Sequence, residues 1–139
     1  GVYRRIPVRI MGAYHTPPDP ILVPEQMENL ITEFEGNRKL HPIERAALFH
    51  LKFEGIHPFV DGNGRTGRLI LNFMLMQAGY PPINVQYSDR KRYHEALNQY
   101  SMCNDSDYCK RNYRSPESLL TLFFERSIIC LFQTYQLLT

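Results

Sequence analysis

Twelve consecutive residues near the middle of the chain, 57–68, contain residue types that can handle phosphate groups. Gly62, Asn63 and Gly64 readily adopt the positive-φ backbone that points successive N–H groups into one concavity, which suits an anion. An apolar stretch follows at 69–76 and predicts a buried helix. The turn would open this helix, so the positive end of the helix dipole would face the same concavity.

Four side chains of the same run could complete a site for phosphate chemistry. Arg65 and Arg68 are three positions apart, so they share a helix face and offer two guanidinium groups to phosphate oxygens. His57 can accept a proton near neutral pH, and Asp61 can bind a hard divalent cation. These are the components of phosphoryl or nucleotidyl transfer. The structural alternatives are a buried, hydrogen-bonded histidine, a turn-forming aspartate and two solvated arginines.

The run resembles the signature of the Fic family, which reads His-x-Phe-x-Asp/Glu-Gly-Asn-Gly-Arg-x-x-Arg. All eight fixed positions are met, by His57, Phe59, Asp61, Gly62, Asn63, Gly64, Arg65 and Arg68. The likeness extends over roughly residues 3–101, including an alternating, Pro-rich segment before the run and Ala-Gly-Tyr-Pro-Pro after it. It implies a mainly α fold, a Fic-type helical bundle with a small β-hairpin flap over the active site.

The resemblance also implies an activity, the transfer of AMP from ATP to a Ser, Thr or Tyr hydroxyl of a target protein with release of pyrophosphate. His57 would be the general base, and Asp61 would hold Mg²⁺ between the α and β phosphates. The amides of 62–64 and the Asn63 side chain would cradle the phosphates, while Arg65 and Arg68 would secure the β and γ phosphates. Phe59 would anchor the loop in the core.

The nucleotide's orientation and base depend on other positions. Relatives with a bulkier residue at Gly64 can act as kinases, so glycine implies AMP transfer. His94 and Leu97, with Ser101, are the implied base-pocket residues, and the flap would form the other wall. The family more often has Tyr at the position of His94 and a longer polar residue at that of Ser101, which leaves the preferred base open. Plain helix packing is the alternative for all three residues.

Two other functions stay open for the same motif. One is the reverse reaction, a hydrolase that removes AMP from a modified side chain with water. The other is a nucleotide-binding regulatory or adaptor module. Many relatives carry an inhibitory helix, Ser/Thr-x-x-x-Glu-Gly/Asn, whose glutamate pairs with the second motif arginine. Neither Glu35 nor Glu125 lies in that pattern, so we expect the inhibitor, a helix or an antitoxin-like partner, to lie outside this chain.

The elements that position the motif can be predicted from periodicity. Residues 5–10 alternate charged and apolar side chains, and 21–23 could return as a second strand, which together would make the flap. By resemblance, a target protein docks at this flap as an extended segment, by strand addition. Helices are predicted at about 24–35, closed by Gly36, at 42–55, and from about 64 until Gly79, the last as the buried centre of the bundle. Two further helices are predicted, at 89–101 capped by Ser88 and at 115–137.

The totals limit the classes of protein that the chain could be. Its 139 residues suit one domain, and we interpret 1–139 as a single Fic catalytic domain cut from a longer chain, since it starts without Met. A net charge of +2 does not indicate nucleic acid, and residues 90–92 are expected on a solvated face. No apolar run is long enough to cross a membrane. Three cysteines favour free thiols and a cytoplasmic protein, although a Cys103–Cys109 bridge stays possible after export.

Overall fold

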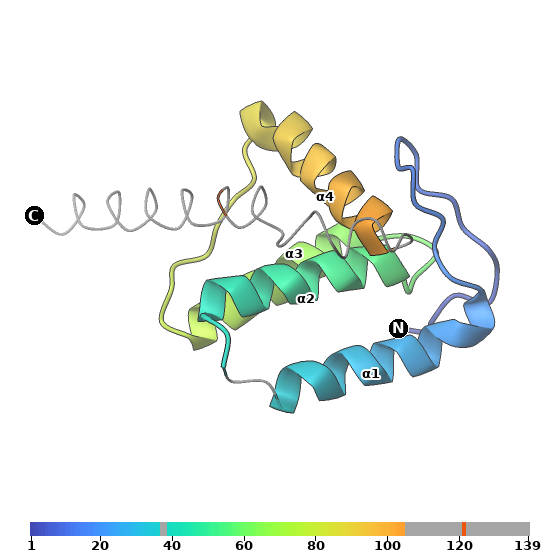
Figure 1. The fold of residues 1–139 in the computed structure, drawn as a ribbon, viewed down its shortest axis with the longest axis horizontal. Helices are drawn as coiled ribbons and strands as arrows, with labels where there is room; N and C mark the ends of the chain where they lie inside the picture. The colour runs from blue at the N-terminus through green and yellow to red at the C-terminus, as the bar shows by residue number, and fades with distance from the viewer. Residues whose placement is uncertain (37–38, 105–120, 122–139) are drawn as a thin grey trace, which may run out of the picture.

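The computed structural model describes residues 1–36, 39–104 and 121, with side chains for 1–36, 39–100 and 121. Four α-helices and two short 3-10 helices make up the described part, and Figure 1 shows α2 and α3 side by side between α1 and α4. Their bounds are η1 Pro20–Leu22, α1 Val23–Gly36, α2 Pro42–Ile56, α3 Asn63–Gln77, η2 Tyr87–Asp89 and α4 Arg90–Asn104. The predicted mainly α fold is therefore confirmed for this region.

Helix α2 is the centre of the described bundle, because it carries buried side chains on two faces. One face packs with α3, α4 and the segment before α4; its buried members are Ile43, Ala46, Ala47, Leu51, Leu71, Leu75, Ile83, Tyr93 and Ala96. The other packs with α1; its buried members are Val23, Met27, Leu30, Phe34, Phe49, Phe53 and Ile56. Such close-packed apolar contacts on both sides hold α2 firmly, and α2 delivers His57 at its end.

The prediction that the helix starting near 64 is the buried centre was wrong. Only Asn63, Gly67, Leu71 and Leu75 of α3 are buried, whereas Leu69 is 70% and Phe73 56% exposed. The sequence places apolar residues on every face of α3, but only the residues of one face pack against α2. Composition alone could not show which of two apolar helices lies inside.

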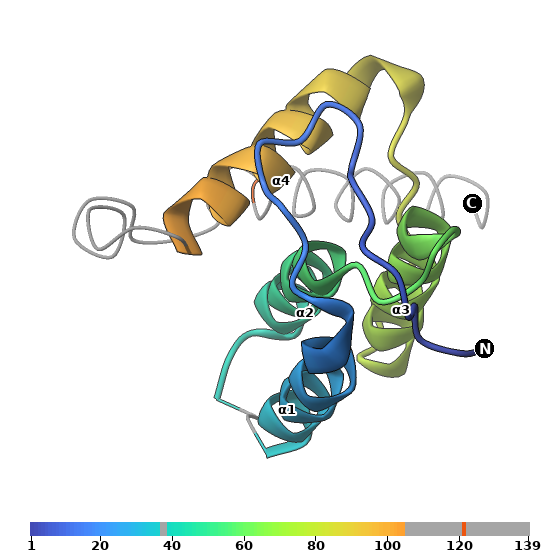
Figure 2. The same ribbon diagram turned by 90° about the vertical axis from the view of Figure 1, so that its right-hand side faces the viewer.

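The predicted hairpin flap has no strands among the described residues. Residues 1–19 form an irregular segment that loops up beside α4 (Figure 2), and 21–23, predicted as the second strand, lie in η1 and at the first residue of α1 instead. Pro7, Pro17 and Pro18 lack the N–H groups that a strand ladder needs. The buried guanidinium of Arg4 takes the carbonyls of Ile6 and Pro18 as acceptors, at 3.3 and 2.6 Å, in place of a partner strand.

The other predicted helices agree with the structure in place and differ at their ends. Gly79, with φ +82°, follows α3 as predicted, whereas Gly36 is the last residue of α1 without positive φ. Ser88 lies inside η2, which runs directly into α4, so it is not an isolated helix cap. The helix predicted at 115–137, except for residue 121, and the possible Cys103–Cys109 bridge fall outside the residues whose side chains are described. In the described residues no helix is long and apolar enough to cross a membrane.

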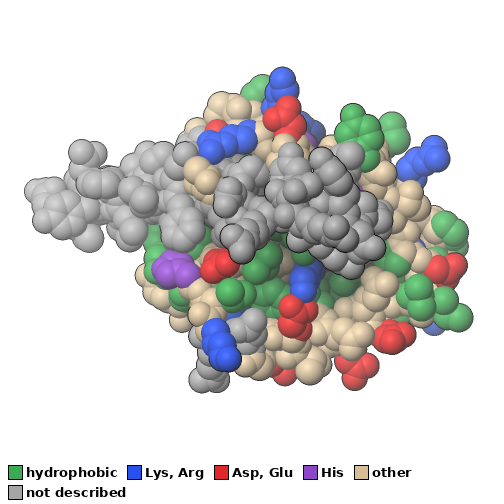
Figure 3. All heavy atoms as spheres, viewed as in Figure 1, with side chains coloured by type: hydrophobic (Ala, Val, Ile, Leu, Met, Phe, Trp, Pro, Cys, Tyr) green, Lys and Arg blue, Asp and Glu red, His purple; other side chains and the backbone are tan. Residues whose placement is uncertain are grey.

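Figure 3 shows that acidic and basic side chains are interspersed over the described part of one face. This mixture agrees with the small net charge of the whole sequence. Mixed charge keeps a surface soluble without producing a large field of one sign.

Candidate functional site

The loop between α2 and α3 is closed by Asn63. This residue is 2% exposed, and its side chain accepts from the Phe59 N–H and donates to the Phe59 carbonyl, both at 2.8 Å. Gly62 then turns the chain with φ +84°, and the Gly62 carbonyl accepts the first helical bond from Thr66 at 2.9 Å. Both polar groups of the Asn63 side chain therefore shape the loop, and its predicted contact with phosphates stays a prediction.

The N-terminus of α3 remains suited to an anion. The first N–H groups of a helix have no intrahelical acceptor, and Gly62, the residue before α3, has no side chain to cap them. The backbone amides of Asn63, Gly64 and Arg65 are therefore available in the first turn, at the positive end of the helix dipole. The backbone part of the predicted cradle is thus present.

His57 ends α2 in a left-handed conformation, φ 52° and ψ 60°, which is uncommon for a residue with a side chain. Its backbone N–H donates to the Phe53 carbonyl at 2.9 Å, and its Nδ1 lies 3.3 Å from the Glu54 carbonyl. A carbonyl only accepts, so the proton is on Nδ1 and Nε2 is left as the basic atom. Burial lowers the pKa of His57, which keeps the ring neutral and ready to accept a proton.

Arg4 fixes this unusual backbone from the far end of the described chain. It is 3% exposed, its Nε donates to the His57 carbonyl at 2.8 Å, and its Nη2 donates to the Ile56 carbonyl at 3.4 Å. Its backbone N–H also donates to the Pro58 carbonyl at 2.9 Å. A cation at the C-terminus of α2 satisfies carbonyls that the helix leaves open and complements its dipole. Arg4 therefore holds the position of His57.

Asp61 and Arg65 form an exposed pair at the rim of the loop. Arg65 Nη2 and Asp61 Oδ2 are 3.0 Å apart, and the side chains are 76% and 90% exposed. Mg²⁺ is usually bound by one or two carboxylates together with substrate phosphates and water, so this single exposed carboxylate fits a magnesium–nucleotide complex. In the part of the chain that the structure describes, no group of three or more His, Cys, Asp or Glu could hold a metal ion.

Arg68 has different surroundings from Arg65, because it faces polar side chains of two neighbouring helices, α2 and α4. A Cβ on Gly64 would lie 3.2 Å from Arg68 Nη1, so the absent side chain leaves room for the guanidinium. The charge of Arg68 acts on Glu54 of α2 and on Tyr93 of α4. Burial raises the pKa of Glu54 to about 7, although Arg68 opposes that rise.

A cavity of about 350 Å³ joins the two predicted base-pocket residues to the N-terminal segment. His94 and Leu97 of α4 line one side, and residues 10–13 line the other, with Glu54 also reaching the cavity. Asn98 Nδ2 donates to the Gly12 carbonyl at 3.2 Å and holds the two walls together. Burial, and then Arg90 and Arg68, lower the pKa of His94. The structure brings together the predicted pocket residues, while the Ser101 side chain lies outside the description.

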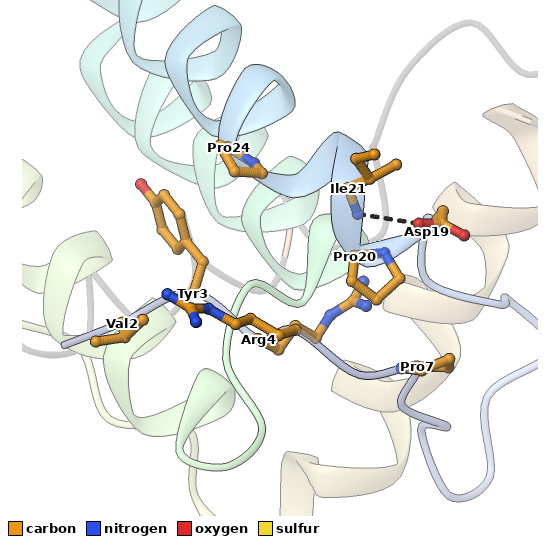
Figure 4. Close-up of a pocket in the computed structure, with 9 residues that line it drawn as sticks. Val2, Tyr3, Arg4, Pro7, Asp19, Pro20, Ile21 and Pro24 are labelled. Atoms are coloured by element: carbon orange, nitrogen blue, oxygen red, sulfur yellow. Dashed lines mark hydrogen bonds between the residues drawn. The ribbon is translucent and has the colours of Figure 1, made fainter.

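A larger cavity, of about 680 Å³, lies elsewhere, between the N-terminal segment and the start of α1. Figure 4 shows Tyr3, Arg4, Asp19 and Pro24 around it, with the Ile21 N–H bonded to Asp19. It contains none of the residues predicted for the site. Volume alone is therefore a poor guide to the site in this fold.

Three residues with a place in the site were missed from the sequence: Arg4, Glu54 and Tyr93. For Glu54 a signal existed, because an acid in the last turn of a helix faces the negative end of its dipole. Its place one turn before His57, between the buried Phe53 and Ile56, was a second signal. Arg4 and Tyr93 act across 53 and 43 positions of sequence, on His57 and His50 respectively, where local patterns carry no information.

Comparison with known families agrees with this geometry. The family model described as "Fic/DOC family" matches residues 1–75. A protein named protein adenylyltransferase Fic, from Nematostella vectensis, is 46% identical over 105 residues. That match covers 71% of this chain and 23% of the relative, so the chain spans less than a quarter of the relative's length.

Solved structures show a similar fold. A Fic domain containing signaling protein from Bacteroides thetaiotaomicron superimposes with a TM-score of 0.79 at 29% identity, over 94% of this chain and 53% of that one. Fic-1 from C. elegans superimposes with a TM-score of 0.69 at 27% identity, over 93% of this chain and 36% of that one. The helical arrangement is thus shared with Fic proteins of a bacterium and an animal.

Proposed function

The chain belongs to the Fic/DOC family, and we propose that it is a protein adenylyltransferase, which transfers AMP from ATP to a hydroxyl side chain of a target protein. The observation that carries the proposal is the arrangement of the loop between α2 and α3. Asn63 folds this loop so that the neutral His57 precedes it and the uncapped amides of α3 follow it. The base lies beside this loop, because His57 is only two residues before Phe59, to which Asn63 bonds. Their Cα atoms are within about 8 Å of each other.

His57 is the general base of this transfer. Its Nε2 takes the proton from the target hydroxyl, and the hydroxyl oxygen attacks the α-phosphorus of ATP. The bond between the α-phosphorus and the bridging oxygen of the β-phosphate breaks, and pyrophosphate leaves with the electron pair. The lowered pKa of His57 favours the neutral form that this step needs at neutral pH.

The phosphates are held by the first turn of α3 and by the two motif arginines. Backbone amides at a helix N-terminus stabilise the negative charge that develops during transfer, at no cost of reorganisation. Arg68 binds the terminal phosphates from the side of α4, and Arg65 assists from the exposed rim. Asp61 would hold Mg²⁺, which would neutralise phosphate charge and help the pyrophosphate to leave.

The cavity between α4 and residues 10–13 receives the base of the nucleotide. Leu97 offers it an apolar surface, and His94, kept neutral by its lowered pKa, offers a ring that can stack. The target protein docks beside the same N-terminal segment as an extended chain, where backbone pairing aligns its hydroxyl with His57. Such pairing would give residues 5–10 the strand partner that the described residues do not provide.

The test is transfer of the nucleotide to protein. The chain is incubated with Mg²⁺, a cell lysate and ATP labelled at either the α or the γ phosphate, and modified peptides are identified by mass spectrometry. We expect the α label and the mass of AMP on Ser, Thr or Tyr, and no modification with His57→Ala. The urea midpoint of His57→Ala shows whether that variant is folded.

The other outcomes would replace the proposal with a different one. The γ label on protein would indicate a kinase. Loss of AMP from a protein adenylylated beforehand, without any transfer, would indicate the hydrolase. Binding of ATP with neither reaction would indicate a regulatory module.

A further inference from the structure

The helix that delivers the general base ends without the backbone donors that usually close a helix. Helix α2 ends at Ile56, and His57 follows in the left-handed conformation. In such an ending the next residue normally donates its backbone N–H to the helix, but Pro58 has no N–H to donate. The last carbonyls of a helix have no intrahelical partner, so the carbonyls of residues 54–57 need other donors.

His15 of the N-terminal segment supplies one of these donors. Its Nε2 lies 2.8 Å from the Gly55 carbonyl, although the two residues are 40 positions apart in the sequence. A carbonyl only accepts, so Nε2 carries a proton and donates it. The Glu54 carbonyl lies 3.3 Å from His57 Nδ1 and accepts from the ring of the base itself. Imidazole rings thus satisfy the first two of these carbonyls.

Arg4 satisfies the other two and also ties the N-terminal segment to itself. Its Nη2 and Nε donate to the carbonyls of Ile56 and His57, at 3.4 and 2.8 Å. The same guanidinium donates to the carbonyls of Ile6 and Pro18, at 3.3 and 2.6 Å. One buried cation therefore closes the residues between Ile6 and Pro18 into a loop and fastens this loop to the end of α2.

The clamp formed by Arg4 and His15 holds a loop, residues 6–18, that belongs to the site. Residues 10–13 and His15 line the cavity proposed for the nucleotide base, and the target protein is proposed to dock beside the same loop. Burying a charge lowers stability unless its hydrogen bonds are satisfied, and Arg4 is 3% exposed. An apolar side chain could fill this space without that cost, so an arginine here needs a reason beyond packing.

The clamp acts on a residue whose backbone needs support. At φ 52°, His57 is in a region that a residue with a side chain keeps only where its surroundings hold it. Misplacing a reacting group by about 1 Å can slow a reaction about 100-fold. Burial is the main cause that lowers the pKa of His57, and the charges of Arg4 and His15 lower it further, which agrees with their place beside the base.

We propose that Arg4 and His15 are positioning residues, which fix His57 relative to the loop 6–18, so that the base and the surface for the target protein form one unit. This inference rests on the proposed function, in which His57 is the base and the target docks beside this loop. Both residues act through the backbone at the end of α2. Their loss should therefore slow the transfer step and leave the binding of ATP as it is.

The test measures AMP transfer by four variants of the full chain to a target found with the lysate. Arg4→Lys keeps the charge, but its compact ammonium cannot bond to four carbonyls, and Arg5→Lys is the control at the exposed neighbouring arginine. His15→Leu removes the donor, whereas His15→Gln keeps an amide that can donate. We expect kcat to fall about 100-fold in Arg4→Lys and about tenfold in His15→Leu. KM for ATP should stay within about twofold, His15→Gln should recover most of kcat, and Arg5→Lys should change neither.

His41 provides a control for a general loss of stability, because it caps the opposite end of α2. Its Nδ1 accepts from the Ile43 N–H at 3.3 Å. The two ends of this helix are about 20 Å apart, so a change at His41 does not reach the base directly. His41→Leu should lower the urea midpoint about as much as His15→Leu does and leave kcat unchanged.

A measurement without turnover applies even where transfer is too slow to follow. Amide hydrogen exchange detected by NMR reports local opening of the last turn of α2. The His57 N–H, which donates to the Phe53 carbonyl at 2.9 Å, should exchange about tenfold faster in His15→Leu than in the unmodified chain. In His41→Leu its rate should change by less than about twofold.

The contrary results are distinct. Equal losses of kcat in His15→Leu and His41→Leu, or equal exchange of the His57 amide in both, would overturn the positioning role. A raised KM for ATP with kcat intact would make the clamp a nucleotide contact instead and would also overturn it. Transfer that survives His57→Ala would overturn the proposed function and this inference with it. If the unmodified chain transfers no AMP, the proposed function fails, and the exchange rates alone decide whether the clamp holds His57.

Discussion

Arg65 and Arg68 look equivalent in the sequence, but the exposed rim and the buried wall of the site give them different surroundings. At the rim, Arg65 is 76% exposed and pairs with Asp61, which is 90% exposed. At the wall, the charge of Arg68 acts on Glu54, Tyr93 and His50, and the last two are buried. Rim charges are screened by water and salt, whereas charges at the wall are screened much less.

The difference teaches which part of the site is set before a ligand binds. An exposed ion pair contributes little to stability, so Asp61 and Arg65 can exchange partners when a nucleotide and a metal arrive. The wall is fixed by hydrogen bonds and close packing between three helices, so a change there alters folding as well as binding. The following predictions compare the wall with the rim.

The largest contrast is expected between the two arginines in AMP transfer. Arg68→Ala should lower kcat/KM for ATP by about 100-fold or more, as expected for a group that stabilises transition-state charge. Arg65→Ala should lower it by less than about tenfold, since water and salt already weaken its charge. Steady-state transfer assays with both variants measure the contrast. Equal losses would show that the wall has no special role.

A glycine of the wall should be more sensitive than a glycine outside it. A Cβ on Gly67 would lie 2.4 Å from Glu54 Oε1, whereas nothing lies within 4 Å of a Cβ on Gly36. Overpacking of this kind costs about 1–3 kcal/mol, so Gly67→Ala should lower the free energy of unfolding by roughly that amount. Gly36→Ala should be neutral or slightly stabilising, because alanine favours helix. Urea unfolding of the two variants tests this, and equal effects would contradict the packing.

Glu54 should make the wall sensitive to pH. Its pKa is about 7 in the folded protein and near 4.5 when unfolded, so the folded state binds its proton more tightly. Stability is therefore lost as the pH rises from 4.5 through 7. Glu54→Gln removes this loss and should add about 2–3 kcal/mol at pH 8, with little of that gain at pH 5. A gain that is the same at both pH values in urea unfolding would contradict the burial of a titrating carboxyl.

The smallest effect on stability is expected at the rim. Asp61→Asn removes one partner of an exposed ion pair and should change the free energy of unfolding by less than about 0.5 kcal/mol. The same variant should raise the Mg²⁺ concentration needed for half-maximal transfer, because a carboxylate is lost from the metal site. Thermal unfolding and a magnesium titration of activity provide the two measurements. A large loss of stability would place Asp61 in the wall.

Local features of the fold and site were predictable because they depend on neighbouring residues. Proline at 42 and glycine at 79 limit α2 and α3 by their own backbone chemistry, and the Gly62 turn follows from its freedom at positive φ. The ring of Phe59 contacts the rings of Tyr3 and Phe53, with 6.0 and 6.3 Å between ring centroids. These contacts confirm that Phe59 anchors the loop in the core.

The failures have a common cause, which is competition between local pattern and distant partners. The alternation at 5–10 predicts a strand, but Arg4 binds the nearby carbonyls and prolines remove donors. The bonds of the Asn63 side chain to the Phe59 backbone were likewise not predicted. Neither competing partner can be identified from spacing, because each depends on how the chain folds back.

The most direct test of the central claim is a titration of the ¹⁵N-labelled chain with ATP and Mg²⁺, followed by NMR. If residues 57–68 form one triphosphate site, the largest saturable shifts should occur at the backbone amides of Asn63, Gly64 and Arg65. Arg68→Ala should weaken the saturation without moving its location. Largest shifts around the cavity beside Pro20 and Pro24, or no saturable shift at the first turn of α3, would contradict the account.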